Sequence, residues 1–292
     1  MPPALLTVEE WTRRAAAHEA RIDRWTVPHR ERRRRGETHP VHDFLFTYYS
    51  ESPGRLRRWH PGPGVGLAGP APHAGWRWYS TDADDAVRLD VAAFLAVRGD
   101  TVRFIRGLLA ATASRPAFSG CFGLHEWAMV YRDRETRHPV PLRLGADGTD
   151  AVVEAHPIRC THFDAFRFFT PSAVPRNRLQ PTRESQPDLE QPGCLHAGMD
   201  LYKWAYKLSP ATPGDLVADC FELAVDIREL DMRASPYDLR GHGYQPVAIE
   251  TPEGKAEYVA AQRGFAERGA LLRQRLLEVC DALISDAVPS HG

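Results

Sequence analysis

A predicted helix near residue 200 carries a histidine, an aspartate and two lysines on one face. At 100° per residue, this stripe of His196, Asp200, Lys203 and Lys207 spans about 60°. The chain has three lysines among 37 basic residues, and two of them lie on this stripe. Because an ammonium suits a site that needs a compact cation or an amine of shifted pKa, we interpret His196, Asp200 and Lys203 as catalytic candidates. The alternative is a solvated face with weak surface ion pairs.

The next predicted helix carries an acidic stripe. Its members are Asp215, Asp219, Glu222, Asp226 and Glu229. Two antiparallel helices could oppose the His/Lys stripe to this acidic stripe. A solvated acidic face is the alternative interpretation.

A further carboxylate lies in an apolar segment. Gly123–Tyr131 places His125 and Glu126 side by side among apolar residues. A buried carboxylate must be paired, protonated or metal-bound, so Glu126 is a catalytic candidate if this segment is buried. At an exposed helix start, Glu126 would need no partner.

The pair His162-x-Asp164 offers metal ligands or an oriented acid and base. Asp164 could equally form only an ion pair with Arg159 or Arg167. Imidazoles and carboxylates suit iron, manganese or zinc. An irregular helical metal site could also include an acid of the second helix; the candidate ligands that we name for iron or manganese are Glu126, His162, Asp164, His196 and Asp200.

The elements that position these residues are mostly helices. Apolar residues at helical spacing predict helices at 7–25, 84–98, 101–113, 118–131, 195–208, 215–231 and 252–285, with Pro28 beyond the end of the first. The alternation at 140–155, with a Gly-rich turn at 145–148, predicts a small β-hairpin. A Pro-rich ordered connection spans 170–193. The sequence therefore predicts a mainly α single domain over 1–292, with an N-terminal helical arm at 7–36.

Composition limits the class of protein. The 37 basic and 38 acidic residues nearly cancel, which argues against a strongly basic nucleic-acid module but leaves a local basic groove open. Five widely spaced cysteines without a CxxC pair predict reduced thiols. Without a signal-like start or an 18-residue apolar run, we expect a cytoplasmic protein with no membrane partner. HExxH, GxSxG, GxGxxG and P-loop signatures are absent from the sequence.

Four long blocks resemble one protein family. They are His39–Tyr49, Phe122–Arg132, Cys194–Lys207 and Asp231–Asp238. Together they resemble an actinobacterial family of about this length whose members are commonly labelled 3-methyladenine DNA glycosylase. The resemblance implies an N-glycosylase that excises alkylated bases from DNA, with no cofactor.

The residues offer parts for such a reaction. A glycosylase needs a carboxylate, aromatic walls for the extruded base and cations for the phosphates. Asp200 or Glu126 could supply the carboxylate, and Lys203 could instead attack the sugar as an amine. The substrate-binding candidates are the aromatic residues Trp127, Tyr202 and Tyr237 and the cations Arg32, Arg33 and Lys207.

Two other classes of protein compete with this hypothesis. One is a metal-dependent oxygenase or hydrolase that acts on a small molecule through the His/Asp/Glu residues, with iron or manganese as cofactor. The other is an interaction protein without chemistry, in which these polar groups would be exposed. Two histidines beside a carboxylate, His39, His42 and Asp43, add a modest metal signal after the Arg30–Arg35 run.

Overall fold

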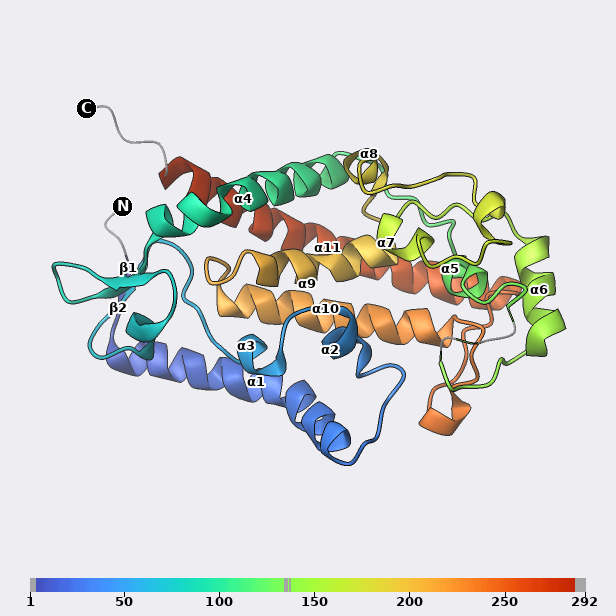
Figure 1. Cartoon of the computed structure of the whole chain (residues 1–292), viewed down its shortest axis with the longest axis horizontal. Helices are drawn as coiled ribbons and strands as arrows, with labels where there is room; N and C mark the ends of the chain where they lie inside the picture. The colour runs from blue at the N-terminus through green and yellow to red at the C-terminus, as the bar shows by residue number, and fades with distance from the viewer. Residues whose placement is uncertain (1–3, 134–135, 137, 287–292) are drawn as a thin grey trace. The chain divides into compact units, whose positions relative to one another are not determined.

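The computed structural model describes residues 4–133, 136 and 138–286 (Figure 1). It confirms a mainly α protein with a small sheet. Contacts divide the chain into two compact units. Unit 1 takes the residues up to Ala110, Leu201–Glu222 and the residues from Leu271 onward, and unit 2 takes Ala111–Asp200 and Leu223–Ala270. Within the described part of the chain, no helix is both long and apolar enough to cross a membrane.

Unit 1 contains the sheet and the N-terminal helices. Its elements are β1 (Ala4–Leu6), α1 (Val8–Arg34), α2 (Phe44–Tyr48), α3 (Pro53–Leu56), β2 (Val65–Leu67), the 3-10 helix η1 (Pro72–Gly75), β3 (Tyr79–Thr81), β4 (Val87–Leu89) and most of α4 (Val91–Ala113). The sheet has the order β1-β2-β4-β3, in which only β1 and β2 are parallel. Leu6 pairs with Leu67, and Leu67 pairs with Val87, which aligns apolar side chains across three strands.

Unit 2 consists of short helices joined by long ordered segments. They are α5 (Leu124–Ala128), α6 (Gly145–Ala155), α7 (Phe163–Phe166), η2 (Val174–Arg176), α8 (Gln186–Leu189) and η3 (Arg240–His242). Three longer helices, α9 (Leu195–Lys207), α10 (Gly214–Arg233) and α11 (Pro252–Asp286), contribute residues to both units. Their bounds lie within two residues of the predicted ones.

The hairpin predicted at 140–155 is wrong, because Gly145–Ala155 forms α6. Thr149, Val152 and Val153 are buried at positions i, i+3 and i+4, which is the spacing of one helix face. Gly145 begins the helix with φ +66°, a conformation that glycine adopts at low cost. The small sheet instead lies in unit 1.

Two other helix bounds differ from the prediction. The segments 84–98 and 101–113 contain strand β4 followed by the single helix α4, which runs through Gly99. The segment 118–131 forms only the short helix α5. Phe122 and Gly123 precede α5 at φ 48° and 70°, and this left-handed backbone prevents an earlier helix start.

Helix α1 begins as predicted, with a Thr7/Glu10 capping box, but does not end before Pro28. A proline inside a helix costs about 3 kcal/mol, so contacts beyond it must offset this loss. Buried Asp43 supplies them, because its carboxylate accepts hydrogen bonds from His29 Nδ1 at 2.8 Å and Arg32 Nη2 at 2.5 Å.

We expect Asp43→Ala to lower the free energy of unfolding by roughly 3 kcal/mol, because it leaves the buried His29 and the partly buried Arg32 without their acceptor. Urea unfolding measures the change. Glu37→Ala is the control, because it removes an exposed ion pair with Arg35 that contributes under about 1 kcal/mol. Equal effects of the two substitutions would contradict this account of the helix end.

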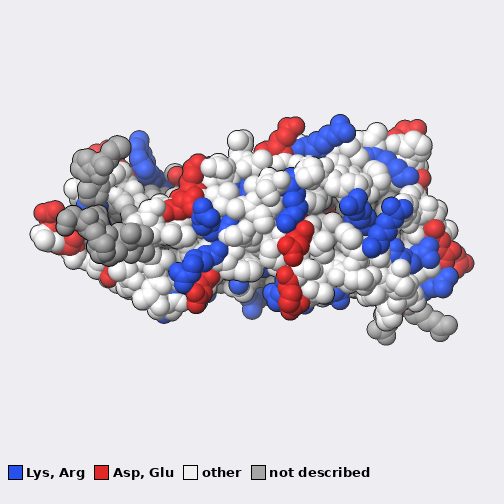
Figure 2. All heavy atoms as spheres, turned by 90° about the horizontal axis from the view of Figure 1, so that it is seen from above, with Lys and Arg blue, Asp and Glu red and all other residues white. Residues whose placement is uncertain are grey.

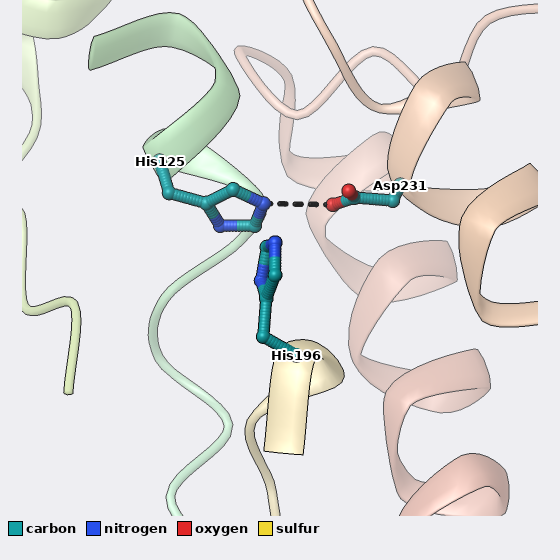
Figure 3. A group of neighbouring side chains, drawn as sticks. All are labelled: His125, His196 and Asp231. Atoms are coloured by element: carbon teal, nitrogen blue, oxygen red, sulfur yellow. Dashed lines mark hydrogen bonds and ion pairs between the residues drawn. The ribbon is translucent and has the colours of Figure 1, made fainter. Parts of the chain in front are cut away.

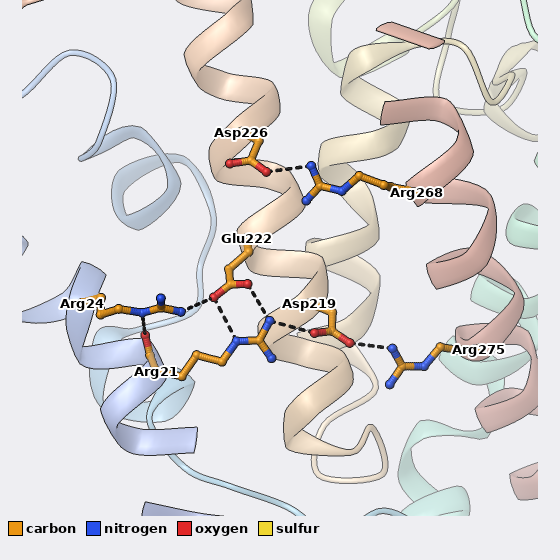
Figure 4. A network of polar contacts seen from close by, with 7 residues as sticks. All are labelled: Arg21, Arg24, Asp219, Glu222, Asp226, Arg268 and Arg275. Carbon is orange, nitrogen blue, oxygen red and sulfur yellow. Dashed lines mark hydrogen bonds and ion pairs between the residues drawn. The ribbon is translucent and has the colours of Figure 1, made fainter. Parts of the chain in front are cut away.

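The acidic stripe of α10 pairs with arginines (Figure 4). In unit 1, Arg21 of α1 contacts Asp219 at 2.8 Å and Glu222 at 2.6 Å. In unit 2, Arg268 of α11 contacts Asp226 at 2.8 Å. These partly exposed pairs fit the solvated interpretation of the stripe. On the face drawn in Figure 2, basic and acidic side chains are interspersed, as the near-zero net charge suggests.

Candidate functional site

A cluster of titratable side chains is buried inside unit 2. Its members come from α5, the segment before α7, the end of α8, α9 and α10, and each is less than a tenth exposed. They are His125, Glu126, His162, Glu190, His196, Asp200, Arg228 and Asp231. Because buried charges are stable only when paired, hydrogen-bonded or metal-bound, the contacts among these residues decide what the cluster can do.

The first group is His125, His196 and Asp231 (Figure 3). His125 Nε2 lies 2.8 Å from Asp231 Oδ1, and the His196 ring meets the His125 ring edge-on with 4.4 Å between centroids. One ligand atom from each residue lies within 4.8 Å of the others. Two imidazoles and one carboxylate could therefore bind one ion together.

The second group is His162, Glu190 and Asp200, which also offer ligand atoms within 4.8 Å of one another. His162 Nε2 lies 3.2 Å from Glu190 Oε1 and 3.4 Å from Asp200 Oδ2. Gln186 donates a hydrogen bond to Glu190 Oε1 at 2.5 Å, which orients that carboxylate. His162 Nδ1 is buried and has no hydrogen-bond partner within the described part of the chain.

The two groups meet at His196. Its ring stacks on the His162 ring with 5.3 Å between centroids, while its edge-on contact reaches His125. Arg228 connects the first group to Glu126, because its Nη1 lies 3.0 Å from Glu126 Oε1 and 3.4 Å from Asp231 Oδ2. The eight residues thus form one continuous buried cluster.

The carboxylates of the cluster shift the pKa values of its imidazoles. Burial alone would lower the pKa of His162, but Asp200 and Glu190 outweigh burial and raise this pKa to about 9. Burial also opposes the charged form of His125, yet Asp231 raises its pKa well above the usual value. His196 differs: burial and the neighbouring His125 cation lower its pKa, so it is neutral at pH 7. The cluster therefore contains two imidazoles whose pKa is raised, His125 and His162, and one whose pKa is lowered, His196.

Four of the residues predicted from sequence lie in this cluster. Glu126, His162, His196 and Asp200 come from three separate segments and are brought together by the fold. Asp164 is not among them. Its Oδ1 lies 3.2 Å from Arg167 Nε, which is the ion-pair alternative to a metal-ligand role.

Lys203 belongs to unit 1, whereas the cluster belongs to unit 2. Its ammonium lies over the Trp204 ring, 4.7 Å from the centroid, so the structure gives it a cation–π partner.

The aromatic residues predicted to stack on a base are packed in the interior. Trp127 and Tyr202 are 0% exposed and Tyr237 is 2% exposed. Trp127 Nε1 donates to the Ala234 carbonyl at 2.9 Å, and Tyr202 packs against Phe221 in unit 1. None of these three rings offers a free face to an extruded base.

The three cations that were predicted to contact phosphates have different surroundings. Arg32 pairs with Asp43, whereas Arg33 is exposed near the end of α1. His39 Nδ1 accepts hydrogen bonds from the backbone of the following turn, and His39 N donates to Asp43, so the His39–Asp43 motif closes a turn instead of forming a metal site. Lys207 lines a pocket in unit 1.

Glu190, Arg228 and Asp231 were not singled out from the sequence. Glu190 lies in the Pro-rich segment that was predicted to be a connection, where no periodic pattern marks it. Asp231 lies two residues after Glu229, which places it on the buried face of α10 opposite the acidic stripe. The available signal was the apolar neighbourhood of Arg228 and Asp231, because charges among apolar helix positions require partners.

No known protein family, curated protein or solved structure matches this chain. The geometry of the buried cluster is therefore the basis for a functional proposal.

Proposed function

We propose that unit 2 holds an iron or manganese ion in the buried cluster and that the protein is a metal-dependent oxygenase or hydrolase. The observation that carries this proposal is the adjacency of two buried groups, His125/His196/Asp231 and His162/Glu190/Asp200, each with ligand atoms within 4.8 Å of one another.

The charge of the cluster supports a cation. Arg228 can compensate only one of the four buried carboxylates Glu126, Glu190, Asp200 and Asp231. Without a metal, protons on His125 and His162 reduce the remaining negative charge, as their raised pKa values indicate. A divalent ion would replace these protons, since imidazoles bind metals in the neutral form.

The donor atoms favour iron or manganese. The six candidate ligands are imidazole nitrogens and carboxylate oxygens, the mixture typical of non-haem iron and manganese sites. Such an ion supplies Lewis acidity to a bound water or, for iron, oxygen chemistry. Glu126 and Arg228 would then position Asp231, because Arg228 contacts both carboxylates. Burial of the cluster favours a small substrate over a macromolecule.

The glycosylase activity implied by the resemblance is a weaker proposal for this geometry. Its aromatic wall would have to come from residues other than Trp127, Tyr202 and Tyr237, because these are buried. Asp200 could still act as its carboxylate only where DNA can approach, and its side chain is buried against His162.

Metal analysis of protein stripped with a chelator and reloaded with Fe(II) or Mn(II) tests the metal centre. We expect stoichiometric metal in the natural protein and at least a tenfold loss of affinity in Asp200→Asn and Asp231→Asn. Asp226→Asn is the matched control, because it makes the same change on α10 at a half-exposed ion pair with Arg268. Metal should also raise the melting temperature of the natural protein but not of the two ligand variants.

Two outcomes would overturn the proposal. One is natural protein that binds neither ion and whose melting temperature does not respond to them. The other is release of alkylated base from methylated duplex DNA by metal-free protein, lost in Asp200→Asn, which would favour the glycosylase.

A further inference from the structure

Unit 1 contains a pocket of about 450 Å³ that the metal proposal does not use. It lies among α3, the segment from Trp76 to Trp78, α4 and the end of α9. This volume is within the range of small-molecule sites. All of its lining residues belong to unit 1.

The pocket is strongly cationic. Its basic lining residues are Arg55, Arg58, Arg77, Arg98 and Lys207, and its acidic lining residue is Glu51. Within the described ranges, no carboxylate lies within ion-pair distance of Arg55, Arg58 or Arg77. The sequence neighbour Arg57 differs, because it pairs with Asp23 at 2.7 Å. Arg55, Arg58 and Arg77 therefore remain available to an anion, whereas Arg98 Nη2 donates to the Lys207 carbonyl at 2.8 Å.

Aromatic rings line the same pocket. The guanidinium of Arg58 lies over Trp76 at 5.2 Å, and that of Arg77 lies over Trp78 at 4.2 Å. Both tryptophans are partly exposed, unlike the buried Trp127 of unit 2. Tyr206 adds a third ring. These partly exposed rings give the pocket aromatic surface that a planar ligand can contact.

The titratable groups Glu51 and His60 do not prevent an anion from binding in the pocket. Burial raises the pKa of Glu51 to about 7, against the opposing effect of Arg55 and Arg58, so this carboxyl is partly protonated near neutral pH. Burial lowers the pKa of His60 to about 3, which keeps this imidazole neutral. Perturbed groups in a concave pocket are typical of functional sites.

We propose that this pocket binds a small phosphate monoester that carries an aromatic ring. Guanidinium groups are suited to the phosphate through charge-assisted, bidentate hydrogen bonds. The ring would stack on Trp76 or Trp78, and the pocket volume accommodates a ligand of this size. The proposal stands on unit 1 alone and does not depend on a metal in unit 2.

Tryptophan fluorescence and calorimetry with four probes test this pocket. Adenosine monophosphate and phenyl phosphate contain both a ring and a phosphate, whereas adenosine and inorganic phosphate contain one part each. We expect at least one of the two monoesters to bind at least tenfold more tightly than both single-part probes. Preference between the two monoesters distinguishes a nucleobase from a simple aryl ring.

Arg58→Gln and Arg77→Gln should each weaken monoester binding at least fivefold, and Trp78→Leu should remove most of the fluorescence response. Arg14→Gln is the matched control, because it removes an equal charge from an exposed site on α1. The proposal is overturned if neither monoester binds at millimolar concentration, or if Arg14→Gln weakens binding as much as Arg58→Gln. Binding of single-stranded DNA without binding of either monoester would also overturn it.

Discussion

Arg228→Gln is expected to lower the free energy of unfolding by about 3–5 kcal/mol, the range for breaking a buried ion pair from one side. The guanidinium is 2% exposed and lies between Glu126 Oε1 and Asp231 Oδ2. Glutamine cannot compensate these carboxylates, so Glu126 would lose its cation and Asp231 would keep only His125. Burial already raises the pKa of Glu126 against the effect of Arg228, and without Arg228 this carboxyl should bind a proton at higher pH still.

Urea unfolding at pH 7 of metal-free protein measures this loss. Arg268→Gln is the control, because its half-exposed pair with Asp226 should contribute under about 1 kcal/mol. Adding Glu126→Gln to Arg228→Gln should recover part of the stability, since it removes the carboxylate that has lost its cation. If Arg228→Gln is no more damaging than Arg268→Gln, the cluster is not organised around this guanidinium.

The stability that His162 contributes to the metal-free protein should decrease at alkaline pH. Its folded pKa of about 9 lies above the ordinary value of 6.5, so the contribution is fully present below about pH 6.5. It is then lost as the pH rises through 9, and linkage gives a total on the order of 3 kcal/mol. The physical cause is the loss of the imidazolium that faces Asp200 and Glu190.

The difference in unfolding free energy between natural protein and His162→Gln, measured from pH 6 to pH 10, isolates this contribution. Groups that titrate in both proteins, such as Glu51, cancel in the difference. NMR titration of the His162 ring in natural protein gives the midpoint directly, even if the variant fails to fold. A flat difference curve together with a midpoint below 7 would contradict the assigned pairing.

The long helices could be predicted from sequence because their apolar stripes are continuous. In α10 the spacing of residues such as Leu216, Cys220 and Leu223 sets the helical period of the buried apolar stripe, whereas α9 is buried around most of its circumference. Helix α6 was harder to predict. Val152 and Val153 are residue types that favour a strand, and the buried Thr149 completes a helical face only in the folded protein.

The candidate site could be predicted only in part. Glu126 stood out as a carboxylate in an apolar segment, and His162 through its pair with Asp164. His196 and Asp200 stood out because they share one helix face with two of the three lysines. Their partners could not be identified in the same way, since Glu190 and Asp231 lie far along the chain from the histidines that they contact. Asp164 is the converse case, where closeness in sequence to His162 suggested a shared ligand role that the Arg167 contact replaces.

The burial of the cluster has a kinetic consequence for any ion that it binds. His162 and Asp231 are 1% and 0% exposed, so a chelator in solution cannot touch the ion while unit 2 is closed. Exchange must then wait for local opening of the short helices and loops that cover the cluster. The rate at which a chelator removes the metal would report how often unit 2 opens, and would become independent of chelator concentration once opening limits it.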